Sequence, residues 1–234
     1  MKEIKRGMKN GIPIALGYLS VSFSFGAIAV SMGFSVIQAV LISLLNLTSA
    51  GQFASLGIIA GQGTYLEMAI VELTVNIRYA FMSLSLSQKV DEKFKGIYKW
   101  LLSFFITDEI FAVAIQNPGK IKRNYFAGLT IVPIIGWTIG TLGGALMGNI
   151  LPAIITNALG VALYGMFIAV VVPKAREDSH VFIAVCIAIA ISTVLKYTPV
   201  FANLSGGFAI IICTVAASLI AAILFPVEVN EDEL

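Results

Sequence analysis

Three long stretches of the sequence contain no Asp, Glu, Lys, Arg or His. They run from Asn10 to Leu66, from Asn124 to Pro173 and from Tyr197 to Val227. A helix needs about 20 apolar residues to cross the roughly 30 Å of hydrocarbon in a bilayer. Each stretch can hold at least one such helix, and the first two can hold two each. Such a chain has too little polar surface for a soluble globule, so it is predicted to lie in a membrane.

Composition narrows the class of function. Hydrophobic residues make up 58% of the 234 residues, whereas charged residues make up only 12%, about half the share found in soluble domains. The formal net charge of +2 gives no sign of a nucleic-acid partner. Cys186 and Cys213 lie in apolar stretches without metal-ligand spacing and are interpreted as packing residues. The prediction is an all-α polytopic integral membrane protein that sits in the lipid bilayer and needs no cofactor.

Turn residues and charges divide the chain into about 7–8 hydrophobic segments within a single transmembrane domain, residues 1–234. The basic N-terminus favours a cytoplasmic start, and hence a multi-pass protein of the cytoplasmic membrane. The predicted segments are Pro13–Met32, Ser35–Ala60, Tyr65–Ser87, Trp100–Gln116, Phe126–Met147, Leu151–Val172, Val181–Lys196 and Ser205–Phe225.

Residues 11–117 resemble residues 124–227 weakly, which suggests two repeated halves. The matched positions, at offsets of 115 to 120 residues, are Pro13 with Pro133, Met32-Gly33 with Met147-Gly148, and Arg78-Tyr79 with Lys196-Tyr197. Transporters are often built from such repeats. Chance similarity between apolar segments is the alternative explanation.

Basic residues do not fix the number of crossings. Cytoplasmic loops carry an excess of Lys and Arg. If all segments cross from a cytoplasmic start, the lysines between Lys89 and Lys99 fall outside. If the second segment and its counterpart fold back, those lysines move inside, but Lys120, Lys122 and Arg123 fall outside. Neither topology places both basic clusters inside, so the crossing number stays open.

The second segment is interrupted by small and polar residues between Asn46 and Phe53. A break there would leave free N–H groups and aim the positive end of the next half-helix at the gap. This arrangement suits a carboxylate or a zwitterion, and it makes Ser49 and Gln52 candidate substrate-binding residues. The alternative is a continuous helix that packs closely through Ser49, Ala50 and Gly51.

Arg78 lies deep inside the apolar segment that begins at Tyr65, about 15 Å of helical rise from Gln88. A charge at this depth needs a partner or a watery cavity, which makes it a candidate functional residue. Glu72 and Asn76 are four residues apart and share a helix face. Arg78 points roughly 200° away from Asn76. All three are candidate substrate-binding residues, and a structural ion pair that locks two helices is the alternative for Arg78.

Asp108 and Glu109 stand at the centre of the short apolar segment Trp100–Gln116. Two neighbouring carboxylates cannot both stay ionised easily in hydrocarbon. One could pair with Arg78, and one could bind a substrate ammonium or take up a proton, so both are candidates for ion or proton coupling. The alternative is a solvated pair in an interfacial segment, because a segment this short barely spans a bilayer.

A helix face of small residues marks the first predicted segment of the second half. Gly136, Gly140, Gly144 and Gly148 recur every four residues. Small residues at this spacing let two membrane helices approach closely. They are therefore predicted to form a packing surface.

The combination of these motifs resembles the AzlC family, the large subunit of branched-chain amino acid exporters, over about Gly11 to Phe225. The residues that carry the resemblance are Pro13, Phe25-Gly26, Gly33, Ser49–Phe53, Asn76–Tyr79, Met82–Ser85, Asp108-Glu109, Trp137, Gly140-Thr141 and Gly144. Two positions depart from the family pattern. Gly51 abuts Gln52 directly, and Gly160 stands where the family usually has an aspartate.

The resemblance implies export of branched-chain or similar apolar amino acids, together with a small AzlD-type membrane subunit. The residues agree with a secondary transporter, since no Gly-x-x-x-x-Gly-Lys-Ser/Thr motif is present. An enzyme is not expected, because the only histidine is His180 and no His-Glu-x-x-His motif occurs. A channel or a structural subunit of a larger membrane assembly is the alternative, although neither charged rings nor a filter repeat is visible.

Overall fold

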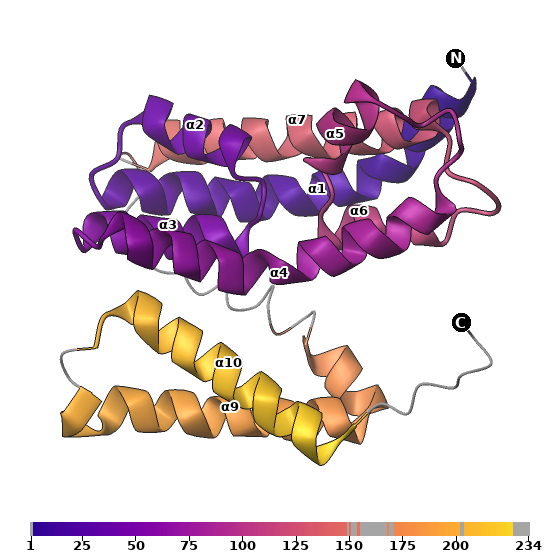
Figure 1. Ribbon diagram of the computed structural model, residues 1–234. Helices are drawn as coiled ribbons and strands as arrows, with labels where there is room; N and C mark the ends of the chain where they lie inside the picture. Colours follow the sequence, from indigo (N-terminus) through magenta and orange to yellow (C-terminus); the bar gives the residue numbers. More distant parts are fainter. Residues whose placement is uncertain are drawn as a thin grey trace. The chain divides into compact units, whose positions relative to one another are not determined.

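The computed structural model describes residues 2–148, 150, 154, 168, 171–201 and 204–226. These residues are helical apart from their turns and one isolated bridge between Val90 and Ile121. The helices are α1 (Lys2–Ser31), α2 (Val36–Leu45), α3 (Ala50–Ala60), α4 (Tyr65–Lys89), α5 (Ile97–Ser103), α6 (Asp108–Ile115), α7 (Arg123–Met147), α9 (Ser179–Tyr197), the 3₁₀ helix η1 (Pro199–Phe201) and α10 (Gly206–Leu224) (Figure 1).

The predicted all-α fold is confirmed for the described residues, and five helices among them are long and apolar enough to cross a membrane. These are α1, α4, α7, α9 and α10. The chain divides into two compact units. The first contains Met1–Leu56 and Val75–Tyr164, and the second contains Gly57–Thr74 and Gly165–Leu234. The predicted segment Leu151–Val172, including Gly160, lies almost wholly outside the described residues.

Helices α1 and α7 form the scaffold of the first unit and run parallel. A Cβ added at Gly7 would meet the backbone of Tyr125, and one added at Gly26, further along α1, would meet that of Thr141, further along α7. The predicted glycine surface of α7 is confirmed. A Cβ at Gly136, Gly140 or Gly144 would lie within 2.7 Å of a backbone oxygen of α1. The two helices therefore touch backbone to backbone along most of their length.

The start of α1 differs from the predicted segment, which began at Pro13. The helix begins at Lys2 and carries Pro13 in its interior. The basic N-terminal residues are helical because this part of α1 also packs on α7, where a Cβ at Gly128 would lie 2.2 Å from the Ile4 carbonyl oxygen. Packing on α7 thus extends α1 toward the N-terminus, past Pro13, which the sequence predicted as the first helical residue.

The second predicted segment is broken, as one of the two sequence interpretations expected. Helix α2 ends at Leu45, residues Asn46–Ser49 form a tip, and α3 begins at Ala50. Phe53 on α3 packs edge-on against Phe25 of α1, with ring centroids 5.2 Å apart. Leu56 reaches a buried cluster that includes Ala29 and Ala39, near the end of α1 and the start of α2. The chain therefore enters and returns at the same end of the unit, and we call α2, its tip and α3 the first hairpin.

The fourth predicted segment, Trp100–Gln116, is also broken, which the sequence analysis did not expect. Helix α5 ends at Ser103 and α6 begins at Asp108, with Phe104–Thr107 as the tip between them. Thr107 caps α6 and accepts a hydrogen bond from the Ile110 N–H. We call α5, this tip and α6 the second hairpin. In Figure 1, the two hairpins occupy opposite ends of the first unit.

The return of the second hairpin gathers three basic segments at one end of the first unit, which we call the basic end. The Lys122 ammonium lies 3.7 Å from the Glu3 carboxylate, next to the basic start of α1. The Ile121 N–H donates to the Lys89 carbonyl at 2.8 Å, which joins the two loops that flank the hairpin. Neither topology considered from the sequence placed both basic clusters on the cytoplasmic side, because in both of them the fourth segment, Trp100–Gln116, crossed the membrane.

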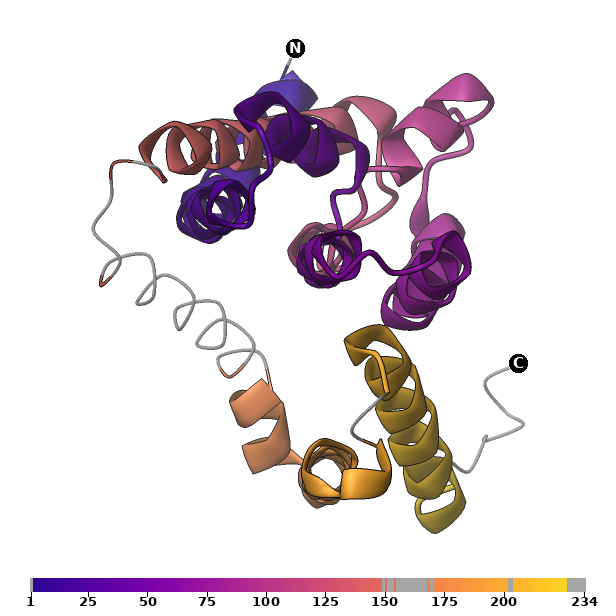
Figure 2. The same cartoon turned by 90° about the vertical axis from the view of Figure 1, so that its left-hand side faces the viewer.

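The second unit contains the pair α9 and α10, which lie side by side and are joined through η1 (Figure 2). At the start of α4, the buried Glu67 carboxylate accepts a hydrogen bond from the Ser205 hydroxyl, which also caps α10. Gly207 packs against the Glu67 side chain. The division into repeated halves stays a prediction, because the second-half counterpart of the first hairpin lies outside the described residues.

Candidate functional site

The tips of the two hairpins meet beside α4 in the first unit. The Tyr79 hydroxyl donates a hydrogen bond of 3.3 Å to the Thr48 carbonyl oxygen at the first tip. Its neighbour Arg78 binds Asp108, the first residue after the second tip, with Nη1 2.9 Å from Oδ1 and 2.8 Å from Oδ2. Two consecutive residues of one helix thus reach both breaks. We call this place the tip junction.

The ion pair between Arg78 and Asp108 is open on one side. Their side chains are 40% and 35% exposed, respectively. Arg78 Nη2 donates to the Tyr79 hydroxyl at 3.3 Å. Among the described residues, the buried Nε of Arg78 has no hydrogen-bond partner. A guanidinium presents five N–H donors, so this one has capacity left for a further acceptor.

The first tip contains a strained residue and a buried polar chain. Ser49 has φ +52°, a conformation that non-glycine residues seldom adopt. Gln52 is fully buried, and its Nε2 donates to the Ser43 hydroxyl at 3.1 Å. Ser43 and Thr141 share a hydrogen bond of 2.6 Å, which ties the hairpin to α7. Within the described part of the chain, Ser49 Oγ and Gln52 Oε1 are buried without hydrogen-bond partners.

The second tip is fastened to α1 by Tyr18. The Tyr18 hydroxyl donates a hydrogen bond of 2.5 Å to Glu109 Oε2, and it also lies 2.5 Å from Thr107 Oγ1. Trp137 of α7 packs edge-on against the Tyr18 ring at a centroid distance of 5.1 Å. Glu109 is therefore turned toward α1, whereas Asp108 is turned toward α4.

Of the sequence-predicted site residues, Arg78 and Asp108 form the tip junction, and Ser49 follows Thr48 in the first tip. Gln52 lies on α3, and its hydrogen bond joins it to Ser43 of α2. Asn76 is half-buried on α4, two residues before Arg78. Glu72 is half-buried too, but it lies on the part of α4 that belongs to the second unit. The roles of these residues and of Glu109 in binding or coupling stay predictions.

Sequence reasoning missed the residues that fasten the tips, which are Tyr18, Ser43, Thr48, Thr107 and Thr141. One signal was present. Thr107 followed by Asp108 and Glu109 is a helix N-terminus pattern, with a capping threonine and acidic residues in the first turn. It marks a helix start in the middle of an apolar segment. The partners on α1 and α7 are distant in sequence and leave no local signal.

The tip junction offers both signs of charge at one place. The N-terminus of α3 carries a partial positive charge, and the C-terminus of α2 carries a partial negative one. The ion pair adds a full charge of each sign. Within the described ranges, no group of three or more His, Cys, Asp or Glu side chains is placed to hold a metal ion. This arrangement suits a small zwitterion.

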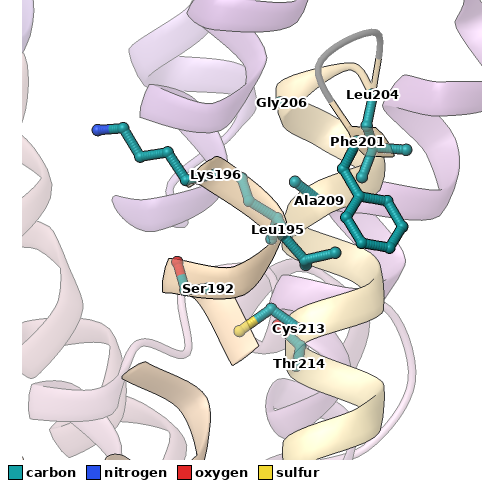
Figure 3. A pocket seen from close by; sticks show the side chains of 10 residues that line it. Ser192, Leu195, Lys196, Phe201, Leu204, Gly206, Ala209, Cys213 and Thr214 are labelled. Carbon is teal, nitrogen blue, oxygen red and sulfur yellow. The ribbon is translucent and has the colours of Figure 1, made fainter. Parts of the chain in front are cut away.

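A separate pocket of about 510 Å³ lies in the second unit between α9 and α10. In Figure 3 the Cys213 sulfur of α10 points toward α9, whereas the Lys196 ammonium points away from it. The Cys213 thiol donates to the Ala188 carbonyl at 3.3 Å. None of the predicted site residues lines this pocket.

Long apolar helices and two discontinuous segments that meet around an ion pair define the class as a polytopic helical membrane protein. Comparison with known proteins identifies the family. The AzlC protein family model matches residues 13–151, and this chain belongs to the AzlC family.

Relatives agree with this assignment. The "Inner membrane protein YgaZ" of Escherichia coli is 26% identical over 92% of this chain and 89% of its own length. An "Uncharacterized membrane protein" of Archaeoglobus fulgidus is 31% identical over 77% of this chain and 80% of its own. The "Branched-chain amino acid transport protein AzlC" of Bacillus subtilis is 24% identical over 72% and 67%. No solved structure matches the chain.

Proposed function

We propose that this chain is a secondary transporter that exports branched-chain or similar apolar amino acids across the cytoplasmic membrane, together with a small AzlD-type membrane subunit. The name of the Bacillus subtilis relative supports amino acid transport. The observation that carries the proposal is the half-exposed ion pair of Arg78 and Asp108 at the tip junction. Discontinuous helices that meet around charged groups are typical of substrate sites in transporters.

An amino acid carries the same two charges as this ion pair. Its carboxylate would bind the guanidinium of Arg78, whose buried Nε has no hydrogen-bond partner among the described residues, and the N-terminal end of α3 with Ser49 and Gln52. Its ammonium would bind Asp108. The zwitterion would therefore insert between the two side chains and replace their mutual contact. Asn76 would contribute to the polar wall on α4, and the candidate role of Glu72 in substrate binding stays a prediction.

Coupling to protons follows from the same competition. Asp108 can hold either the substrate ammonium or a proton, but not both at once. If Asp108 binds the amino acid on one side of the membrane and a proton on the other, the transporter exchanges the amino acid for the proton. Proton entry would then drive amino acid exit, with Asp108 as the coupling residue.

The three basic segments support the proposed orientation. The start of α1, the loop after α4 and the loop before α7 share the basic end of the first unit. Because cytoplasmic loops carry most Lys and Arg residues, we place this end and the N-terminus in the cytoplasm. The second hairpin then opens from the cytoplasm and the first hairpin from the opposite side.

The proposal is tested by counterflow in proteoliposomes, with the chain alone and with its small subunit. Labelled L-leucine should accumulate saturably, with preference over D-leucine. Arg78→Gln should abolish counterflow without lowering the melting temperature of the purified protein. Arg123→Gln is the matched control, because Arg123 also stacks on a tyrosine, Tyr98 at 4.2 Å, but at the basic end. Unsaturable flux, or normal counterflow by Arg78→Gln, would rule out this site.

A further inference from the structure

A pocket of about 470 Å³ opens at the basic end of the first unit, between α4 and α5 and against α7. Its walls include Leu86, Phe94, Ile106 and Phe126, each at most 8% exposed. All four belong to the buried hydrophobic cluster of this half of the unit. The apolar wall is therefore part of the fixed core, and the volume falls in the range of small-molecule sites.

The polar groups of this pocket are few and lie on two sides. Ser83 and Ser87 face it from α4, and Ser103 and Lys99 face it from α5. Lys99 is exposed. The loop before α5 carries Asp91 and Glu92 as well as Lys93 and Lys95, and Lys99 is the one charged side chain among the described residues that line the pocket. Apolar walls with a cation at the rim suit a small molecule that has an anionic head and an apolar body.

The pocket lies next to the tip junction. Ile106, in its wall, is two residues before Asp108. Ser83 is five residues after Arg78 on α4, which corresponds to about 7.5 Å of helical rise. The tip of the second hairpin thus contributes Ile106 to this pocket and continues directly into Asp108 of the ion pair.

We propose that this pocket is a vestibule in which the transported amino acid docks before it reaches the tip junction. The apolar side chain rests against Leu86, Phe94 and Phe126, and the carboxylate faces Lys99. The inference rests on the proposed function, and it adds a second substrate site on the cytoplasmic side. Binding there concentrates substrate beside the second hairpin, whose movement then admits it to Arg78.

Substrate protection of a single cysteine tests the vestibule. Ser87→Cys is placed in the full-length chain with Cys186 and Cys213 replaced by alanine, and a small charged thiol reagent is applied in nanodiscs. Saturating L-leucine should slow modification at least about fivefold, as expected for a site that is mostly occupied. Lys95→Cys, at the same end but outside the pocket lining, should be modified at an unchanged rate. Ser83→Cys provides a second position if Ser87→Cys fails to fold.

A kinetic readout separates docking from transport chemistry. Lys99→Gln should raise the KM for L-leucine about twofold to fivefold, the worth of an exposed ion pair, and leave kcat unchanged. Lys95→Gln should change neither. Protection by an anionic phospholipid but not by leucine would identify a lipid site and overturn the vestibule.

The outcomes also separate the two proposals. Saturable leucine transport without protection at position 87 or 83 overturns the vestibule alone. Absence of amino acid transport by the unaltered chain with its small subunit overturns the proposed function, and the vestibule falls with it. Protection by L-leucine together with the KM effect of Lys99→Gln supports both.

Discussion

A single added methyl group on α7 tests the scaffold. In Gly144→Ala, the new Cβ would lie 1.9 Å from the Phe23 carbonyl oxygen of α1. Ordinary contact begins at about 3.4 Å, so the helices must separate by about 1.5 Å at this point. Backbone on both sides leaves no flexible group to move. Overpacking of this kind destabilises proteins by about 1–3 kcal/mol, and the separation also weakens neighbouring dispersion contacts.

The adjacent residue is a matched control. In Gly143→Ala, the new Cβ would lie 3.6 Å from Phe23 Cδ2, which is an ordinary contact. Alanine also favours the helix over glycine by up to about 1 kcal/mol. Both variants receive this gain because both exchange glycine for alanine within α7, so it cancels in the comparison. The free energies of unfolding of the two variants should therefore differ by the overpacking cost alone, about 1–3 kcal/mol.

Thermal unfolding in detergent measures this difference. For a chain of this size, each kcal/mol shifts the melting temperature by about 2–4 °C, so Gly144→Ala should melt about 2–12 °C below Gly143→Ala. Equal melting temperatures would show that α1 and α7 do not touch along this face. The reasoning about their parallel packing would then be wrong.

Three further predictions concern the site and its topology. Asp108→Asn should leave amino acid efflux insensitive to an imposed pH gradient, and an unchanged dependence would remove this residue from coupling. Thr141→Val should lower the free energy of unfolding by about 1–3 kcal/mol because it strands a buried hydrogen-bond chain, whereas Thr138→Val should not, since that hydroxyl bonds only within its own helix. Cysteines at Lys93 and Lys120 should react with an impermeant thiol reagent from the same side of the membrane; labelling from opposite sides would contradict the folded-back second hairpin.

The membrane class was predictable because it depends on composition, which the sequence states directly. The contact face of α7 was predictable for a similar reason: small residues every four positions lie on one side of any helix. A pairing of Arg78 with one of the two neighbouring carboxylates, Asp108 or Glu109, was among the outcomes considered, because a deep charge needs a partner. Each of these inferences follows from a local pattern and from the cost of burying charge in hydrocarbon.

The course of the chain through the fourth segment was not predictable in the same way. Hydropathy describes whether residues prefer hydrocarbon, but not whether a segment crosses or returns. The return depends on contacts between residues far apart in sequence, such as Tyr18 with Glu109 and Lys89 with Ile121. The capping pattern at Thr107 indicates a helix start, yet only the tertiary contacts make it a hairpin.

Arg78 and Tyr79 are consecutive residues on one continuous helix, and each holds the tip of a different hairpin. A turn or shift of α4 would therefore move both tips together. In the transporter proposed above, this shared tether would oppose the independent withdrawal of the two tips, and it would couple movements at the two ends of the first unit.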